Sequence, residues 1–222
     1  MVPKFTVGDL EDLKTQYSEG RNALILLARA PELGKVKTRI ATEVGAEKAL
    51  HVYTRLLKNI VSSMSDLEKS VRKIIAWTKV PDNTGDYQDW EHWLQPEVDL
   101  GDCMQWAIHN SVALGAEKAI IVGADIPDIS QDRIERAFDT LDYTDVVLGP
   151  AADGGYYLVG AKRDIPELFP DINWGGTDVL DKTTESLQKT GISFQLLDIL
   201  SDIDHWEDWV EWSGRIKKYT ES

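Results

Sequence analysis

Short apolar runs alternate with helical stripes along this chain, and that alternation constrains the fold more than any other feature of the sequence. The run Asn22–Ala28 is almost continuously apolar and is followed by Pro31 and Gly34, which is typical of a strand buried on both faces of a sheet. From residue 45 to residue 64, apolar side chains instead recur every three or four positions. This spacing predicts an amphipathic helix.

The alternation continues towards the C-terminus and predicts an α/β protein. Further strands are predicted at Val71–Trp77, 119–122, 145–148, 156–159 and 193–197, and further helices at 102–114, 129–141, 177–189 and 205–219. Alternating elements of this kind build βαβ units, so we expect a three-layer α/β/α fold around a mostly parallel sheet. The close spacing of the runs at 145–148 and 156–159 predicts one antiparallel pair, which makes the sheet mixed.

Length and composition favour one soluble domain. The 222 residues suit a single domain over 21–222, preceded by an extension over 1–20 that could hold a helix at 7–17. The apolar stretch at 23–28 has the length of a strand, and the first twenty residues lack the layout of a signal peptide. One cysteine, Cys103, excludes an internal disulfide. We expect a cytoplasmic protein.

The formal net charge of −14 bears on the choice of partners. A surface this acidic repels nucleic acid and anionic membranes, so we expect neither as a partner. It remains compatible with a small phosphorylated ligand where basic side chains gather or a divalent cation bridges the two.

One such basic segment follows the first predicted strand, at the edge where open α/β sheets bind ligands. Residues 29–39 carry four basic side chains, Arg29, Lys35, Lys37 and Arg39. Gly34 permits a tight backbone path, and the Arg39 guanidinium can bind phosphate oxygens in a planar fork. We favour a phosphate-binding loop over a solvated loop that offsets the acidic surface. The segment matches neither the Walker A motif nor the dinucleotide-binding fingerprint.

Carboxylates follow two other predicted strands. Asp125 stands after the 119–122 run and before Pro127, where it could bind Mg²⁺ or Mn²⁺ or simply cap the next turn. Asp202 and Asp204 follow the last strand, and we expect Asp204 to be the N-cap of the terminal helix. A capping carboxylate can also bind a metal that lies at the same edge.

The run from Asp153 to Tyr157 follows the 145–148 strand. An Asp-Gly pair alone is a common hairpin turn. The second glycine of the pair Gly154 and Gly155 is more than a turn requires and would let a ligand approach the backbone, while the ring of Tyr156 could stack on a base or sugar. We expect one of the two adjacent tyrosines to lie in the core.

Other residues are interpreted as structural. Trp206, Trp209 and Trp212 share one helical stripe, which predicts that they pack in the core. The four histidines lack metal-ligand spacing, so no zinc site is expected.

Four motifs together resemble a known bacterial family. They are Arg29-Ala-Pro-x-x-Gly34-Lys-Val-Lys-Thr-Arg39, Gly123-Ala-Asp125-Ile-Pro127, Gly149-Pro-Ala-Ala-Asp153-Gly-Gly-Tyr-Tyr157 and Asp202-Ile-Asp204-x-x-Glu-Asp208. The resemblance spans residues 22–209 and is to a domain-of-unknown-function family that is often labelled a radical-SAM/selenodomain-associated glycosyltransferase. That family is similar to the GT-A-like nucleotide-diphospho-sugar transferases, a group that also contains nucleotidyltransferases.

The resemblance implies roles for these motifs. It implies a nucleotide-phosphate loop over residues 29–39, a divalent metal at Asp125 with Asp204 or Asp202 as its second carboxylate, and an acceptor or sugar side lined by Asp153 and residues 154–157. Two departures are visible in this sequence. Arg29 stands where the family more often has Lys, and Cys103 stands where it usually has Arg.

We therefore expect an Mg²⁺- or Mn²⁺-dependent transferase with a nucleotide or nucleotide-sugar donor and a small-molecule acceptor, in which Asp125 and Asp153 are catalytic. Glycosyl transfer and nucleotidyl transfer with release of pyrophosphate both remain open, and the family label favours the first. Two alternatives are a non-catalytic nucleotide-binding protein, which the Cys103 departure favours, and a metal-dependent hydrolase. Homodimers are common among such folds.

Overall fold

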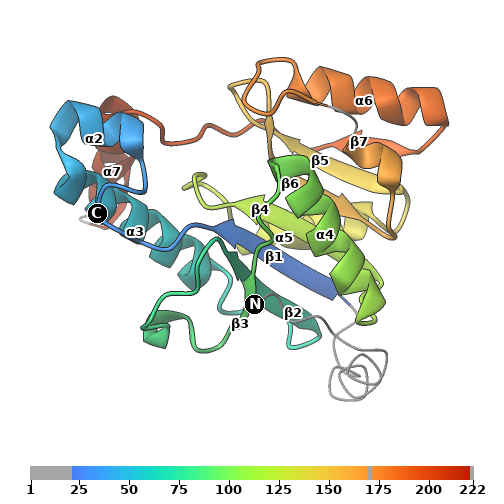
Figure 1. The fold of residues 1–222 in the computed structure, drawn as a ribbon, viewed down its shortest axis with the longest axis horizontal. Coiled ribbons are helices and arrows are strands. Elements are labelled where there is room, and N and C mark those ends of the chain that lie inside the picture. The colour runs from blue at the N-terminus through green and yellow to red at the C-terminus, as the bar shows by residue number, and fades with distance from the viewer. Residues whose placement is uncertain (1–21, 170–171, 221–222) are drawn as a thin grey trace.

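The structure is a computed structural model that describes residues 22–169 and 172–220 (Figure 1). The predicted extension over 1–20 and its helix at 7–17 lie outside the described residues. No helix in the described ranges is long and apolar enough to cross a bilayer.

A seven-stranded sheet forms the centre of the molecule (Figure 1). Its strand order is β3-β2-β1-β4-β6-β5-β7. β6 is antiparallel to both of its neighbours, and the other pairs are parallel. The strands are β1 (Asn22–Ala28), β2 (Val71–Trp77), β3 (Glu91–Leu94), β4 (Lys118–Gly123), β5 (Val146–Pro150), β6 (Tyr156–Ala161) and β7 (Phe194–Leu196).

The described residues also form six α-helices and two short 3-10 helices, of which the C-terminal α-helix follows the last strand. They are α2 (Thr38–Val44), α3 (Ala46–Ser63), α4 (Leu100–Ala113), α5 (Gln131–Thr140), α6 (Val179–Thr190), α7 (Trp206–Thr220), η1 (Gly85–Tyr87) and η2 (Pro166–Leu168). The mostly parallel α/β sheet with its one antiparallel insertion at β6 is confirmed.

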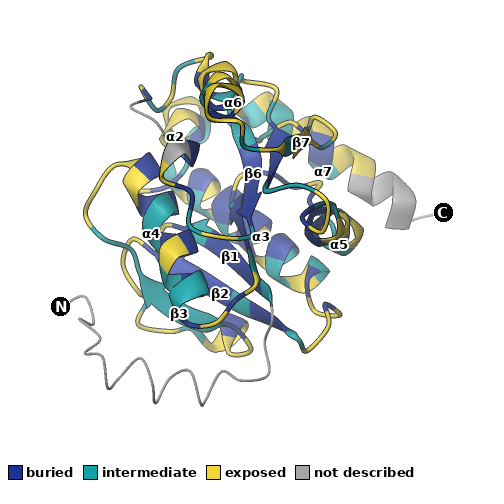
Figure 2. Ribbon diagram, turned by 90° about the vertical axis from the view of Figure 1, so that its right-hand side faces the viewer, coloured by how far each residue is buried: buried dark blue, intermediate teal, exposed yellow. Residues whose placement is uncertain are grey.

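Two apolar cores on opposite faces of the sheet make the three layers. Alternate residues of β1 divide between them: Leu24 and Leu26 pack with α3 and α5, whereas Ala23 and Ile25 pack with α4 and α6. This division is what the period of two along a strand requires when both faces are covered. Figure 2 shows the buried strands between the two helical layers.

A third, smaller cluster joins α2, α3 and α7 at the end of the sheet where the candidate site lies (Figure 1). Ile40, Leu56 and Ile203 are fully or almost fully buried in it. Trp212 is buried as predicted, while Trp206 and Trp209 are partly buried against the same cluster. The terminal helix therefore fixes the segment that precedes it, which carries Asp202 and Asp204.

The structure contains two elements that the sequence does not predict. The basic segment is not a loop throughout, because α2 begins at Thr38. The edge strand β3 was not predicted, since its four residues are only half-buried and lack a continuous apolar run.

Candidate functional site

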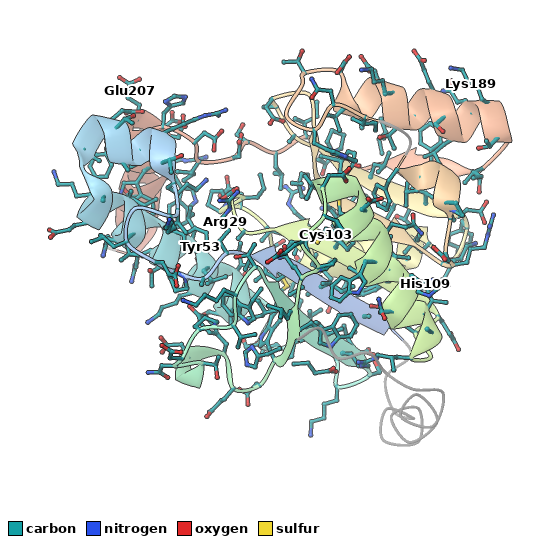
Figure 3. All side chains as sticks on the ribbon, viewed as in Figure 1. Arg29, Tyr53, Cys103, His109, Lys189 and Glu207 are labelled. Atoms are coloured by element: carbon teal, nitrogen blue, oxygen red, sulfur yellow. The ribbon has the colours of Figure 1, made fainter. Side chains whose placement is uncertain are left out.

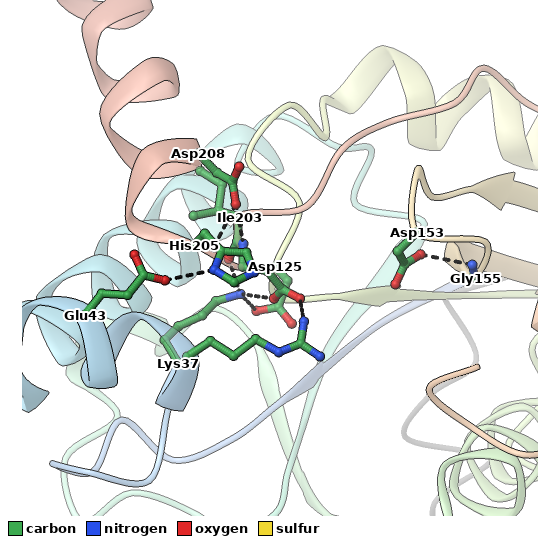
Figure 4. A network of polar contacts seen from close by, with 10 residues as sticks. Lys37, Glu43, Asp125, Asp153, Gly155, Ile203, His205 and Asp208 are labelled. Carbon is green, nitrogen blue, oxygen red and sulfur yellow. Dashed lines mark hydrogen bonds and ion pairs between the residues drawn. The ribbon is translucent and has the colours of Figure 1, made fainter. Parts of the chain in front are cut away.

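Lys37 joins three segments at the carboxyl edge of the sheet (Figure 4). Its ammonium lies 2.7 Å from Asp125 Oδ1 and 3.5 Å from Asp204 Oδ1, and it donates a hydrogen bond to the Ile203 carbonyl. The backbone supports the same arrangement, because the Ile203 N–H donates to the Asp125 carbonyl at 3.0 Å. The end of β4 and the segment before α7 are therefore held together by one lysine.

The backbone of Lys37 is unusual. Its φ of 46° and ψ of 51° place it in the left-handed region, where it is the one described residue other than glycine with a positive φ. This conformation costs an L-residue roughly 1–2 kcal/mol. It turns the chain into α2 and directs the side chain into the protein, where only 5% of that side chain is exposed.

This burial changes the expected role of Lys37. We predicted that its ammonium would hold phosphate, but it contacts three protein oxygens and has three protons to donate. Arg39 also pairs with Asp204, yet 67% of its side chain is exposed. The exposed cations Arg29, Lys35 and Arg39 are thus the ones placed to meet a ligand.

These cations line a pocket of about 220 Å³ that we call the cationic pocket. It also contains Lys37, Asp125 and Asp204. Gly34 has a φ of 72° and provides the turn that precedes Lys35, in keeping with the tight backbone path predicted for it.

A larger cleft of about 570 Å³ adjoins the cationic pocket, and the two share Arg29, Tyr53 and Asp125. We call it the main cleft. Asp125, Asp153 and Asp202 all line it, although they come from three separate segments of the chain. Asp204 lies in the cationic pocket instead, so the structure separates the two carboxylates of the last motif.

Asp202 experiences unfavourable electrostatics. Burial raises the pKa of its carboxyl group, and the charges of Asp204 and Asp153 raise it further, while Lys37 lowers it. Burial is therefore the main reason that the charged form of Asp202 is disfavoured, and its acidic neighbours come second.

The predicted capping role of Asp204 is wrong. The helix α7 begins at Trp206, and Asp208 caps it by accepting from the N–H groups of Asp204 at 3.1 Å and His205 at 2.7 Å. Asp208 thus reaches back from the first turn to these donors, while the Asp204 side chain pairs with Lys37 and Arg39.

The run from Asp153 to Tyr157 divides between the cleft and the core. Asp153 is exposed in the cleft and accepts from the Gly155 N–H at 2.9 Å, as the predicted Asp-Gly turn requires, and it lies apart from the Lys37 contacts (Figure 4). Gly155 and Tyr156 also line the cleft. Tyr157 is the core tyrosine, since only 4% of it is exposed.

Gly154 serves packing, and it is not among the residues that line either pocket. Its φ is 93°, and a Cβ atom there would lie 2.1 Å from the Thr177 carbonyl oxygen. Its own carbonyl accepts from the Leu180 N–H in the first turn of α6. This glycine therefore connects the turn after β5 to the start of α6.

Several cleft residues were missed from the sequence. The segment from Trp174 to Gly176 lines the cleft, and Trp174 packs so closely on Gly101 that a Cβ atom there would lie 2.5 Å from its ring. Gln95 and Asp99 line it from the segment between β3 and α4. The Trp-Gly-Gly run, outside any periodic segment, was the one available signal.

Tyr53 anchors the basic segment from α3. Its hydroxyl accepts from the Arg29 N–H and donates to the Arg29 carbonyl, both at 2.8 Å. Figure 3 shows the two residues together where β1 meets α3, with Cys103 on α4. Burial raises the pKa of the Tyr53 phenol, so this tyrosine is a neutral support.

Cys103 lines the main cleft from α4 with 4% of its surface exposed. Burial, followed by the charge of Asp99, raises the pKa of its thiol to about 11. A thiol with a raised pKa is mostly protonated near neutral pH, and it brings no positive charge to the cleft.

The carboxylates fit a metal only in part. The described residues contain no group of three or more His, Cys, Asp or Glu side chains arranged to hold a metal ion. Mg²⁺, however, is commonly held by one or two carboxylates together with phosphate oxygens of a substrate. Asp125 and Asp202 both line the main cleft and could supply two such carboxylates.

Comparison with solved structures defines the class. The fold is that of the GT-A-like nucleotide-diphospho-sugar transferases and the related nucleotidyltransferases. A Desulfovibrio desulfuricans protein named as a candidate nucleotide-diphospho-sugar transferase is 28% identical with a TM-score of 0.77, over 84% of this chain and 83% of that one.

More distant structures share the fold alone. The 4-diphosphocytidyl-2C-methyl-D-erythritol synthase of Anaerococcus prevotii is 10% identical with a TM-score of 0.56, over 91% of this chain and 99% of that one. The glucosyl-3-phosphoglycerate synthase of Mycobacterium tuberculosis, solved with Mn²⁺, uridine diphosphate and phosphoglyceric acid, is 12% identical with a TM-score of 0.52, over 95% of this chain and 79% of that one.

Within this class, the chain belongs to a bacterial family. The model of the family described as uncharacterized protein conserved in bacteria (DUF2064) matches residues 66–176. No curated protein matches the chain in sequence.

Proposed function

We propose that residues 21–222 form one domain that transfers a sugar from a nucleotide-diphospho-sugar to a small-molecule acceptor. One observation carries the proposal: carboxylates from three segments, Asp125, Asp153 and Asp202, line one cleft that adjoins a pocket of exposed cations. A site of this composition suits a substrate that combines a diphosphate with a hydroxyl-rich sugar. The likeness to the Desulfovibrio desulfuricans protein supports the same class.

The donor diphosphate would lie between the two pockets. Arg29, Lys35 and Arg39 would bind its oxygens, since these side chains are exposed in the cationic pocket. Asp125 and Asp202 would hold Mg²⁺ or Mn²⁺ together with the diphosphate. When bound, the ion supplies positive charge that offsets the charge developing on the leaving diphosphate.

Asp153 is the candidate base. It is exposed in the main cleft, and the Gly155 N–H fixes one of its oxygens at 2.9 Å. In the transfer, the acceptor oxygen forms a bond to the anomeric carbon and passes its proton to Asp153. The bond from that carbon to the phosphate oxygen breaks, and the nucleoside diphosphate leaves with the electron pair.

Lys37 would position this machinery without touching the substrate. Its ammonium fixes one oxygen of Asp125 at 2.7 Å and tethers the segment that carries Asp202. Preorganisation of this kind avoids spending binding energy on assembling the site during the reaction.

The test incubates the protein with a set of nucleotide-diphospho-sugars and acceptors in the presence of Mn²⁺ and measures the release of nucleoside diphosphate. A matched set of nucleoside triphosphates, with release of pyrophosphate as the measured quantity, tests nucleotidyl transfer. Asp153→Asn is expected to slow sugar transfer about a hundredfold or more while binding of the donor is retained.

Two results would contradict the proposal. Pyrophosphate release without sugar transfer would assign nucleotidyl transfer to the site. Tight nucleotide binding with no turnover by the wild type would instead support a non-catalytic binding protein. As a binding control, Arg39→Gln is expected to weaken every nucleotide about tenfold.

A further inference from the structure

The end of the main cleft beside β1 and β3 presents hydrogen-bond acceptors. Gln95 and Asp99 both line it, and neither has a role in the proposed binding of the diphosphate or in the proposed transfer reaction. What these two side chains offer to a ligand follows from the bonds that they already make within the protein.

The orientation of the Gln95 amide is fixed by its neighbours. Its nitrogen lies 2.6 Å from the Ala76 carbonyl oxygen and 3.4 Å from the Ala28 carbonyl oxygen. Both partners are acceptors, so the amino group must face them and the amide oxygen must point the other way. Because Gln95 lines the main cleft, the amide oxygen is the atom that it can offer to a ligand.

Asp99 offers a second acceptor. Its Oδ1 accepts from the Asp102 N–H at 2.9 Å and caps α4. Asp99 lines the main cleft together with Cys103, whose N–H donates to the Asp99 carbonyl at 3.0 Å. No described lysine or arginine forms an ion pair with the Asp99 carboxylate, so Oδ2 is left for a ligand.

The acceptors lie near Arg29, one of the cations proposed to bind phosphate. The Ala28 carbonyl that contacts Gln95 belongs to the residue immediately before Arg29, which lines both pockets. A nucleotide with its phosphates at Arg29 would thus reach Gln95 and Asp99 with its base.

We propose that this end of the cleft selects guanine, so that the donor is a guanosine nucleotide. This deepens the proposed function and rests on it. The Watson–Crick edge of guanine carries two adjacent donors, N1–H and the 2-amino group. Uracil has one N–H between two carbonyl oxygens, and cytosine and adenine place an acceptor beside their amine. Against two side-chain acceptors, guanine is therefore the best match of the four.

The first test compares bases on the wild-type protein by isothermal titration calorimetry with Mn²⁺. The probes are the diphosphates of guanosine, inosine, uridine, cytidine and adenosine. Guanosine diphosphate is expected to bind about tenfold tighter than the uridine compound, and inosine diphosphate, which lacks only the 2-amino group, about tenfold weaker than guanosine diphosphate. Equal binding of the guanosine and inosine compounds, or tighter binding of uridine diphosphate, would overturn the assignment.

The second test reverses the hydrogen-bonding character of one position. In Asp99→Asn the amide oxygen still caps α4, since Asn is as good an N-cap as Asp, and the amino group then faces the cleft. The preference for guanosine over uridine diphosphate is expected to fall about tenfold. Asp102→Asn, which removes the same charge from an exposed neighbour on α4, should leave the preference unchanged.

The outcomes separate the two proposals. Nucleotide binding that is weakened in Arg39→Gln but shows no guanine preference overturns the base assignment alone. Failure of every nucleotide to bind overturns the proposed function and the base assignment together.

Discussion

Replacing Lys37 by Met should destabilise the protein by about 2 kcal/mol. Breaking a fully buried ion pair by removing one partner costs about 3–5 kcal/mol. Here the lysine side chain is 5% exposed, but Asp125 is 51% and Asp204 32% exposed, so water can solvate the carboxylates that remain. For a chain of 222 residues, a loss of this size should lower the melting temperature by about 4–8 °C.

A second variant isolates the backbone strain. Lys37→Gly also removes the ammonium, but glycine adopts a φ of 46° without steric cost. It should therefore be less destabilised by about 1 kcal/mol than Lys37→Ala, which also removes the buried stem but keeps a Cβ atom and hence the strain.

Urea unfolding of the wild type and of the Lys37 variants measures these differences in the free energy of unfolding. Lys35→Met is the control for loss of an exposed lysine charge. The double variant of Lys37→Met with Asp125→Asn should be less destabilised than the sum of its parts, because the two residues are in contact. A change in the free energy of unfolding below about 0.5 kcal/mol in Lys37→Met is the size expected of an ordinary surface substitution. Such a result would refute the conclusion that Lys37 holds the end of β4 and the segment before α7 together.

Three further changes test other parts of the structure. Gly154→Ala should destabilise by at least about 2 kcal/mol in urea unfolding, because its Cβ would lie 2.1 Å from the Thr177 carbonyl oxygen. Asp202→Asn should be more stable than the wild type at neutral pH. The folded-state pKa of Asp202 is raised, so the stability of the wild type falls as the pH rises through that pKa. In acid, where the wild-type carboxyl is protonated, the difference between the two proteins should disappear. Glu43→Gln should lower the pKa of His205 in an NMR titration, because the hydrogen bond to Glu43 raises that pKa. The stability that this pair contributes is present below the ordinary histidine pKa and is lost as the pH rises through the pKa of His205 in the folded protein.

Matched outcomes decide these cases. Gly123→Ala adds the same methyl group where nothing lies within 4 Å, so an equal loss there would remove the packing explanation for Gly154. An Asp202→Asn variant that is less stable than the wild type at neutral pH would show that the carboxylate is stabilised by partners rather than strained. An unchanged His205 titration in Glu43→Gln would show that the acidic neighbours Asp204 and Asp208 dominate.

The sheet could be predicted because its signals are local. Buried parallel strands such as β1 and β4 require continuous apolar runs, and covering helices such as α3 require a stripe of period 3.6. The short elements gave no such signal. The four residues of β3 are half-buried at one edge, and the seven residues of α2 follow a left-handed residue that no propensity scale favours as a helix start.

The predicted strand ends also indicated where the candidate site lies, but they did not predict which residues its side chains contact. The rule that ligands bind at carboxyl ends of strands brought Asp125, Asp153 and Asp202 to one cleft. Whether a cation faces a ligand or the protein depends on one backbone angle, as Lys37 shows with its positive φ. The cap of α7 likewise went to Asp208 rather than Asp204 because of where the helix begins, and helix boundaries are uncertain by a few residues in any sequence-based prediction.

The departure at Cys103 gains a physical meaning from its neighbours. The backbone N–H of Cys103 donates to the Asp99 carbonyl at 3.0 Å, and both side chains line the main cleft. An arginine at this position, as the resemblance leads one to expect, would stand beside the Asp99 carboxylate and could pair with it. With a neutral thiol there, the free oxygen of Asp99 remains an acceptor for a ligand. Under the proposed base assignment, a single substitution at position 103 therefore removes a cation from the cleft and leaves the Asp99 carboxylate without that partner, and the nucleotide series tests the second effect without assuming the first.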